Sequence, residues 1–505
     1  MPRPPVEAYA RKLAQSTTDS VRRATTGQSQ ARTDTMQRTF GDTTEVRTHA
    51  AAIKDYVLDH LGELLEQLET ACVRNGIQVH WASDAAKANA IIVGLCRAAA
   101  PEGAVVAKAK SMATEEIHLN HHLEAAGFVP VETDLGEFVI QIDGDTPSHI
   151  VAPIVHKNRY DVARSFEREK LGPYTEVPEE LAMQARSHLR ASFKQAAIGV
   201  SGVNFAIAES GRLVIIENEG NNRFSTTAPR VHIAVMGIEK LLPREADLPL
   251  FLRLLAGSAT GQRATTYMHG IIGPRRPDEP DGPDEVHLVL LDNGRSNVLK
   301  GDYREILRCI RCGACQNTCP VYRQASGHAY GHVYSGPIGA VLAPALEGVA
   351  KMGYVAKASS LCGACEEVCP VQIPIPRMLL QLRDEAFRAG VAGDSAPWSV
   401  YAFGATHPSA WRAGLKLLPM AEAAPVPIRS SLDGASFGSC HTGRVEPSDH
   451  GGRGEHERSS NDPRRHRRFS WERAAGAVAR AGGGRRSRFA LDERVDRSRR
   501  RSYFT

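Results

Sequence analysis

The sequence predicts an α/β domain with a mainly parallel sheet, followed by a smaller helical domain and a disordered, arginine-rich tail. Three observations support this. Strand-like and helix-like segments alternate from residue 77 onward, seven of the ten cysteines fall between Cys309 and Cys369, and apolar residues become scarce beyond about Ala421. The expected segments are a helical arm over 1–45, the α/β domain over 46–301, the helical domain over 302–395, and a linker with the tail over 396–505.

The first 75 residues indicate helices. Residues 1–45 are polar, with scattered threonine and arginine, and this composition favours an amphipathic helical arm. From Val46 onward apolar side chains recur at helical spacing, for example at Ile53, Val57, Leu61 and Leu64. That spacing predicts a helical segment with one buried face ahead of the first strand.

Residues 77–142 contain the alternation that indicates parallel βαβ units. Strands are expected at 77–82, 104–109, 128–133 and 138–142, with helices at 84–99 and 112–126. Ser111 precedes the second of these helices and is a suitable N-cap. Strands that alternate with helices at this length predict a parallel sheet.

The same alternation continues to the end of the first domain. The expected elements are a helix at 179–196, two strands within 197–224 with a turn at Ser210 and Gly211, a strand at 231–238, a helix at 248–255 and a strand at 286–293. Residues 273–285 are rich in Pro and Asp and are expected to form a loop. In the second domain, helices are expected at 303–308, 337–349 and 376–389, around the cysteines.

The net charge of +5 comes from the tail. Residues 441–505 contain 17 Arg, no Lys and 9 acidic residues, whereas the first 440 residues sum to −3. Arginine without lysine resembles a GC-rich gene read out of frame, and a genuine basic arm is the other interpretation. Because an arginine-rich segment alone is weak evidence for nucleic-acid binding, no nucleic-acid partner is expected.

Two sequence features bear on localisation. No window of about 18 apolar residues is present, and the first residues lack the apolar stretch of a secretory signal. The cysteines are clustered in one region, unlike those of a short disulfide-rich secreted domain. We therefore expect a cytoplasmic protein without direct membrane insertion.

Seven cysteines give the strongest chemical signal, because they form two motifs, C-x2-C-x2-C-x3-C-P and C-x2-C-x3-C-P. They are Cys309, Cys312, Cys315, Cys319, Cys362, Cys365 and Cys369. Such runs let three thiolates bind three irons of a cube, while the cysteine before the proline reaches the other cluster. Two [4Fe-4S] clusters are expected, and the C-x3-C-P closures argue against a zinc ribbon.

This exchange of the fourth cysteine divides the ligands into two sets. Cluster 1 takes Cys309, Cys312, Cys315 and Cys369, and cluster 2 takes Cys319, Cys362 and Cys365. Cluster 2 is one protein ligand short, and alignment of the motifs puts Ser359 where an eighth cysteine would stand. Three outcomes stay open: the Ser359 oxygen or a nearby histidine is the fourth ligand, the fourth iron is open, or the cluster has three irons.

Other polar residues give weaker signals. His328 and His332 lie between the motifs and are candidates for an electron path, although a solvated glycine-rich loop is the favoured interpretation. His118, His121 and His122 share a helix face after Glu115, and a solvated helix is favoured over a metal site. Cys72 and Cys96 are expected to be core thiols, and Cys440 lies in the tail.

A ligand pocket is considered at the ends of the early strands. Open α/β sheets bind ligands outside the carboxyl ends of their strands. The candidates follow strands or form a polar turn near them, with structural ion pairs as the alternative interpretation. They are Lys108, Lys110, Ser111, Glu132, Asp134, Glu137 and the turn at 218–223.

With these residues in place, the chain resembles the iron–sulfur protein B family of the bacterial three-part L-lactate utilisation system. The resemblance covers about residues 40–400 and depends on both cysteine motifs and four further segments. These are ETDLGEFVIQI (132–142), HIVAPIVHK (149–157), NEGNNRFSTTAPRVHIAVMGIEK (218–240) and HAYGHVYSGPIG (328–339). No segment beyond about Ala424 resembles this family.

The resemblance implies both a fold and a role. The fold is a lactate-utilisation α/β domain, related to sugar-phosphate isomerases and CoA-transferases, joined to an α-helical ferredoxin domain. The same two cysteine sets carry over. The implied role is oxidation of L-lactate to pyruvate together with the cysteine-rich A component and the second α/β component, C, of that system.

Iron–sulfur clusters move single electrons but do not abstract a hydride or a proton from a 2-hydroxy acid. The chain is therefore expected to be an electron-transfer subunit that is not catalytic alone, with no catalytic residue assigned. One alternative is a relay for another donor, such as glycolate. Another is a transferase-like enzyme with structural or sensing clusters, in which changes at Lys110 or Glu137 abolish activity and changes at Cys309 or Cys362 do not.

Overall fold

The computed structural model describes residues 6–391, 403–404, 406–409 and 411–412. Its largest sheet has six parallel strands, as the alternating sequence predicts. In spatial order they are β1 (Ile77–Ala82), β10 (Glu285–Leu291), β7 (Val231–Gly237), β4 (Ile198–Gly202), β2 (Val105–Lys108) and β3 (Val129–Glu132). The predicted α/β domain with a mainly parallel sheet is confirmed.

Helices cover both faces of this sheet. The helices of the first 300 residues are α1 (Val6–Ala10), α2 (Gln15–Phe40), α3 (Thr44–Asp59), α4 (Leu61–Arg74), α5 (Ala85–Ala99), α6 (Met112–Glu116), α7 (Leu119–Ala125), α8 (Leu135–Asp143), α9 (Arg159–Arg168), α10 (Pro178–Gln195), α11 (Asn221–Thr227), the 3₁₀ helix η1 (Glu245–Asp247), α12 (Leu248–Thr260) and α13 (Arg295–Lys300). Alternate residues of β7 face opposite layers. Ala234 and Met236 pack with α4, whereas Ile233 and Val235 pack with α5 and α7. This burial on both faces explains the continuous apolar runs of the central strands.

A second, smaller sheet lies beside the first. It contains four strands in the order β8 (Leu241–Leu242), β5 (Phe205–Ile207), β6 (Arg212–Glu217) and β9 (Tyr267–Ile271). The predicted turn at Ser210 and Gly211 joins β5 to β6, and Gly211 has a positive φ of 75°. Strand β9 follows no pattern that the sequence made visible, because its residues are mostly exposed.

Three predicted elements are wrong in type or extent. The first of the two strands expected within 197–224 is divided into β4 and β5, which belong to different sheets. Residues 138–142 lie in helix α8 and not in a strand. The Asp134 side chain caps α8 by accepting hydrogen bonds from the backbone of Gly136 and Glu137, and Phe138 packs on Phe166 of α9. The helix expected over 112–126 is divided into α6 and α7, because His118 adopts a left-handed backbone with φ of 51°.

From residue 302 to residue 391 the described chain contains helices and no strand, as expected. The helices are η2 (Arg304–Arg308), α14 (Ala314–Thr318), α15 (Pro320–Ala325), η3 (His328–Tyr330), α16 (Gly336–Glu347), α17 (Val349–Met352), η4 (Gly353–Lys357), α18 (Ala364–Glu367) and α19 (Ile375–Arg388). None of the described helices is long and apolar enough to cross a membrane. The predicted tail and Cys440 lie outside the described residues.

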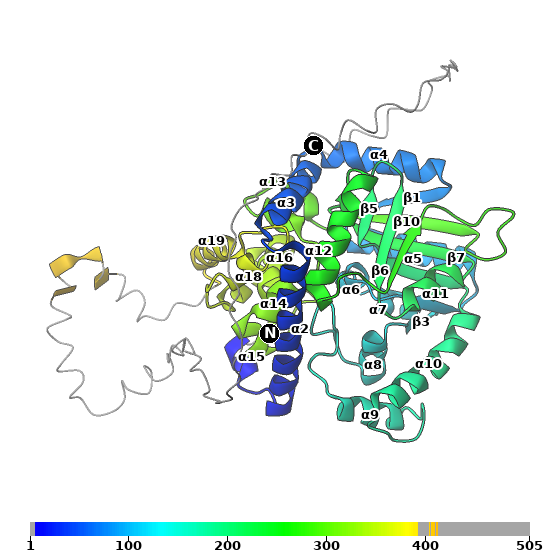
Figure 1. Ribbon diagram of the computed structural model, residues 1–505, viewed down its shortest axis with the longest axis horizontal. Coiled ribbons are helices and arrows are strands. Elements are labelled where there is room, and N and C mark those ends of the chain that lie inside the picture. The colour runs from blue at the N-terminus through cyan, green and yellow to red at the C-terminus, as the bar shows by residue number, and fades with distance from the viewer. Residues whose placement is uncertain (1–5, 392–402, 405, 410, 413–505) are drawn as a thin grey trace, which may run out of the picture. The chain divides into compact units, whose positions relative to one another are not determined.

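The N-terminal helices pack on the cysteine region. In Figure 1, α2 runs as a long blue helix between α12 and the yellow-green helices α14 and α15. Arg32 of α2 donates to the Val368 carbonyl at 2.7 Å, and Arg47 of α3 donates to the carbonyls of Cys369 and Glu366 at 2.8 and 2.9 Å. Helices α2 and α3 therefore hold the loop that carries the last cysteine in place.

Candidate functional site

The cysteine motifs fold as two short loops, each followed by one turn of helix. Helices α14 and α18 begin directly after Gly313 and Gly363, and these glycines have positive φ values of 73° and 84°. The two helices contact each other, so the motifs converge from separate parts of the chain. Six of the seven thiols are buried or half-buried, and Cys362 is exposed.

The electrostatic coupling between thiols defines two groups. Burial raises the pKa of Cys312 to about 12, and Cys369 and Cys309 lie close enough to contribute. Burial, with contributions from Cys319 and Cys362, raises the pKa of Cys365 to about 12. Cys315 is coupled to the first group and also to Cys365, so it lies where the groups meet. The division of the seven cysteines into two ligand sets stays a prediction.

The surroundings of the first group fit an iron–sulfur cluster. A cavity is lined by Cys309, Cys312, Cys315 and Cys369 and otherwise mainly by apolar side chains, including Ile338. The backbone N–H groups of Arg311 and Ile373 point at the sulfurs of Cys309 and Cys369, at 3.4 Å in each case. Buried thiols become thiolates only when a bound cation compensates their charge, and four thiolates in a dry shell with N–H donors are what such a cluster requires.

Ser359 occupies the position in the second loop that Cys309 occupies in the first. The backbone N–H of Leu361 donates to the Ser359 oxygen at 3.1 Å, just as that of Arg311 donates to the Cys309 sulfur. Leu361 and Arg311 both have left-handed backbones, with φ values of 56° and 61°. The two loops therefore have the same local conformation at the position where their sequences differ.

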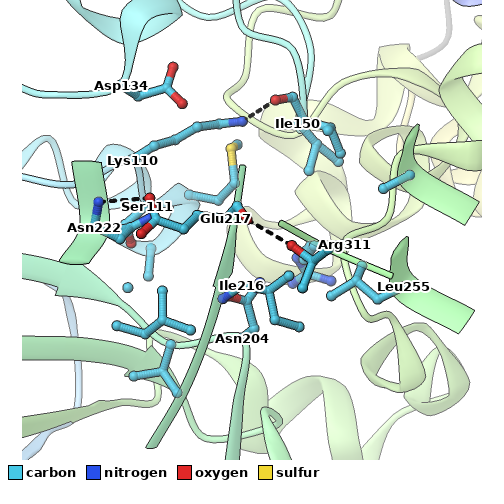
Figure 2. A pocket seen from close by; sticks show the side chains of 18 of the residues that line it. Lys110, Ser111, Asp134, Ile150, Asn204, Ile216, Glu217, Asn222, Leu255 and Arg311 are labelled. Atoms are coloured by element: carbon cyan, nitrogen blue, oxygen red, sulfur yellow. Dashed lines mark hydrogen bonds between the residues drawn. The ribbon is translucent and has the colours of Figure 1, made fainter. Parts of the chain in front are cut away.

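A larger cavity, with a volume of about 330 Å³, lies at the carboxyl ends of the parallel strands. Five strands contribute residues that follow them closely, and each of these residues lines the cavity. They are Lys110 and Ser111 after β2, Asp134 after β3, Val203 after β4, Glu239 and Lys240 after β7, and Arg295 after β10. Figure 2 shows Lys110 and Asp134 along one side of the cavity and Arg311 across from them.

Arg311 connects the two cavities, because it lines both of them and lies between Cys309 and Cys312 in the chain. Its Nη2 donates to Glu239 at 3.1 Å, and its guanidinium stacks on Tyr334 at 4.8 Å from the ring centroid. The large cavity is thus adjacent to the first cysteine group.

Buried charges surround Glu239 at this junction. Arg295 donates to Glu239 at 2.7 Å and to Glu116 at 2.7 Å, and all three side chains are almost fully buried. Lys54, also buried, donates to the Glu239 carbonyl at 2.7 Å. Burial lowers the pKa of Lys240 to about 7, with Arg311 as the next contribution. Four cations therefore meet two carboxylates next to the cysteines.

The sequence did not reveal this charge cluster. Its members come from α3, α6, α13 and the segments after β7 and Cys309, which are far apart in the chain. The one visible signal was the run that ends IEK at 238–240, directly after a buried strand. Only the fold brings these residues together.

Several residues predicted to line the pocket lie outside it, and two of them form a buried ion pair. Lys108 is fully buried and pairs with Glu132 at 2.5 Å and Glu115 at 2.6 Å. Glu137 is buried and, like Glu132, does not line the large cavity. For Lys108 and Glu132 the alternative interpretation, a structural ion pair, agrees with these contacts. The turn at 218–223, in contrast, contributes Asn218, Glu219, Asn221 and Asn222 to the cavity wall.

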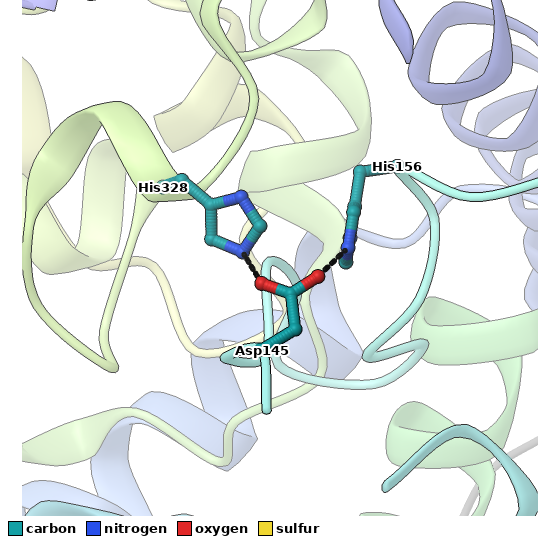
Figure 3. Close-up of side chains that lie close together, drawn as sticks. All are labelled: Asp145, His156 and His328. Carbon is teal, nitrogen blue, oxygen red and sulfur yellow. Dashed lines mark hydrogen bonds and ion pairs between the residues drawn. The ribbon is translucent and has the colours of Figure 1, made fainter. Parts of the chain in front are cut away.

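His328 lies in a polar cluster and not in a solvated loop. Figure 3 shows Asp145 between His156 and His328, with its oxygens 2.9 and 3.7 Å from the two Nε2 atoms. The three side chains are close enough to share a metal ion. However, the Lys157 ammonium is 3.0 Å from Asp145, and His328 also contacts the Thr146 carbonyl, so this cluster is already satisfied without one.

The remaining histidines and cysteines have structural or solvent-exposed positions. His332 pairs with Glu347 at 3.0 Å, away from the thiols. His121 is 82% exposed, and the helix break at His118 interrupts the face that it shared with its neighbours. Cys72 and Cys96 are core thiols, and burial raises the pKa of each to about 12.

Two family models match the chain. The model described as "LUD domain" covers residues 65–291, and the model described as "4Fe-4S dicluster domain" covers residues 305–373. The protein named "Lactate utilization protein B" from Bacillus licheniformis is 45% identical over 387 residues, which are 76% of this chain and 80% of that protein. The chain belongs to the lactate utilization protein B family.

Two further relatives of similar length support this assignment. The protein of the same name from Bacillus subtilis strain 168 is 44% identical over 386 residues, covering 76% of this chain and 80% of that one. The "Uncharacterized electron transport protein YkgF" from Escherichia coli strain K12 is 43% identical over 379 residues, covering 74% and 79%. In this member of the lactate utilization protein B family, the region matched by the 4Fe-4S model contains all seven motif cysteines and Ser359. The region matched by the LUD model contains the ten described strands.

Proposed function

We propose that this chain is the electron-transfer iron–sulfur subunit of a cytoplasmic complex that oxidises L-lactate to pyruvate. The observation that carries the proposal is the first thiol group, which lines a dry cavity beside a second, polar cavity, while the helix of the second cysteine motif packs against it. The names of its relatives, "Lactate utilization protein B" and "electron transport protein", supply the reaction and the role. The cysteine-rich A component and the α/β C component of the lactate utilisation system are the proposed partners.

The proposal assigns the ligands as the motifs suggest. Cys309, Cys312, Cys315 and Cys369 hold the first [4Fe-4S] cluster, and Cys319, Cys362 and Cys365 hold the second. When bound, such clusters accept and release single electrons. Burial of the thiols keeps water away, and the N–H groups that point at the sulfurs favour the charged thiolates.

Ser359 is proposed as the fourth protein ligand of the second cluster. The matching hydrogen bonds and φ values of the two loops support this, because they put the Ser359 oxygen in the place of the Cys309 sulfur. Ser359→Cys should keep the full iron content, whereas Ser359→Ala should lose about one iron of eight. An unchanged iron count and unchanged electron paramagnetic resonance spectrum in Ser359→Ala would contradict this ligand.

The exposure of the thiols indicates a direction for the electrons. Cys312 and Cys369, of the group beside the polar cavity, are buried, whereas Cys362 is exposed. Electron transfer between proteins requires close approach, so the second group is proposed as the side that meets a partner protein. The segments proposed to act are the α/β domain over 46–301 and the ferredoxin domain over 302–395, with the arm over 1–45 packed on the latter.

The direct test is anaerobic isolation of the full chain with iron and sulfide counted. About eight irons per chain, with absorption near 400 nm that dithionite bleaches, is the expected result. A Cys309→Ala variant should lose the first cluster and stop lactate-dependent reduction in the assembled complex. Stoichiometric zinc without iron, or full lactate oxidation by Cys309→Ala, would contradict the proposal.

The transferase-like alternative predicts the opposite pattern in the same assay. In that case Lys110→Met would abolish activity while Cys309→Ala and Cys362→Ala would leave it intact. Lys110 does line the large cavity, whereas Glu137 does not. The matched pair of Lys110 and Cys309 variants therefore separates an enzyme with structural clusters from an electron relay.

A further inference from the structure

The polar cavity contains hydrogen-bond donors that no residue of the described chain satisfies. Arg311 is only 7% exposed, and its Nε and Nη1 have no partner. The amide nitrogen of Asn221, also 7% exposed, has none either. A buried donor without a partner is destabilising, so such groups commonly serve a ligand.

Lys240 adds a charge to these donors. It lines the cavity directly after β7, and within the described part of the chain its ammonium has neither a hydrogen bond nor an ion pair. The neighbouring cations Lys54, Arg295 and Arg311 outnumber the carboxylates Glu116 and Glu239. This end of the cavity is therefore positive and has unused donors, a combination that attracts an anion.

The other end of the cavity has the opposite character. Asp134, Glu217 and Glu219 line it, and only Lys110 brings a positive charge there. One oxygen of Asp134 caps α8, and one of Glu219 accepts from the backbone of Leu135 at 3.1 Å, which leaves the second oxygen of each available as an acceptor. A ligand that suits both ends carries one negative charge and a hydroxyl donor.

We propose that this cavity is a binding site for a small 2-hydroxy acid and its 2-oxo product, with the carboxylate held by Lys240 and Arg311. The 2-hydroxyl lies toward the carboxylate end, where Asp134 and Glu219 can accept from it. This proposal extends the proposed function, because it puts the electron donor in the cavity beside the first cysteine group. It rests on the proposed function for the identity of the acid, L-lactate. A doubly charged phosphate is disfavoured, because the carboxylates at that end would repel it.

The test measures binding and not turnover. The full chain is isolated anaerobically, its iron is counted, and L-lactate, pyruvate and inorganic phosphate are titrated into it by calorimetry. We expect saturable binding of L-lactate and pyruvate. Lys240→Met should weaken this binding at least tenfold, with iron content and visible spectrum unchanged. Lys300→Met, which changes an exposed lysine on α13 outside the cavity, is the matched control.

A second variant separates the cavity from the clusters. Asn221→Ala removes the uncharged amide without a partner that lines the cavity, so it should weaken binding several-fold while the reduction potential of the clusters stays the same. It also covers the case in which Lys240→Met fails to fold.

Three results would overturn the site. They are no binding of either acid to protein with full iron content, unchanged binding in both variants, or tighter binding of phosphate than of the acids. A shift in cluster potential in Lys240→Met with unchanged acid binding would show that this lysine serves the cluster alone. Because iron content is measured first, loss of the site would leave the electron-transfer function standing, whereas protein without iron would count against that function.

Discussion

At the residue scale, Lys108 and Lys240 have opposite surroundings. Lys108 is enclosed by two carboxylates and forms a closed ion-pair unit, whereas Lys240 has no partner among the described residues and lines a cavity. Both follow or end a parallel strand, so sequence position alone does not distinguish them. The number of partners that the fold brings to each ammonium decides whether it stabilises the protein or binds a ligand.

The Lys108 ion pair predicts a large effect on stability. Lys108→Met leaves the buried Glu132 without its cation, and breaking a buried pair in this way costs about 3–5 kcal/mol. Denaturant unfolding of the anaerobic protein, compared with Lys300→Met, measures the loss. The double change Lys108→Met with Glu132→Met should recover most of it, and a single variant as stable as the control would refute the assignment.

Glu219 predicts a pH dependence of acid binding. Burial, followed by the nearby Asp134, raises the pKa of Glu219 to about 7, and Lys110 and Glu217 also face it. As the pH rises through about 7, Glu219 becomes negative inside the cavity and Lys240, whose pKa is also about 7, loses its charge, so the affinity for L-lactate should fall for both reasons. Between about pH 6 and 8 this fall should be smaller in Glu219→Gln, as calorimetry at both pH values would show. Equal slopes in the two proteins would remove Glu219 from the account.

At the element scale, strands were easier to predict from sequence than short helices. The central strands β2, β7 and β10 are buried on both faces and appear as apolar runs, and the pattern locates them and the edge strands β1 and β3 within one or two residues. Helix α8 was mistaken for a strand because FVIQI is rich in β-branched and apolar residues. Its true signal was the cap at Asp134 and the helical spacing of Leu135, Phe138, Val139 and Ile142, which pack in one cluster.

The N-terminal helices predict a protective role for the cysteine loops. Arg47 donates to the carbonyls of Glu366 and Cys369, so Arg47→Met should free the loop that carries Cys369, a proposed ligand of the first cluster. Iron extraction by a chelator, followed at 400 nm under anaerobic conditions, should become several-fold faster. Arg38→Met, an exposed position on α2, is the control. The same extraction rate in both variants would show that α3 does not protect the cluster.

At the scale of the whole molecule, the sequence predicts the two domains and the cysteine motifs. Only the fold shows that the polar cavity lies next to the first cysteine group. Spacing alone singled out the seven cysteines and predicts their division into two sets, because most ligands of such a cluster lie close together in sequence. The polar cavity was only partly visible, since Lys110 and Asp134 follow predicted strands but Glu239, Lys240, Arg295 and Arg311 meet through tertiary packing. The cysteine-lined cavity and the polar cavity lie within one compact unit, and Arg311 borders both.

The central claim is that electrons from L-lactate reach the clusters of this chain. The most direct measurement is anaerobic absorption near 400 nm of the complex isolated through this chain with its native partners. L-lactate, D-lactate and glycolate are added in turn, and dithionite last. The account predicts bleaching by L-lactate and not by the other two. Bleaching by dithionite alone, with no response to L-lactate in a complex that contains its partner proteins, would contradict it.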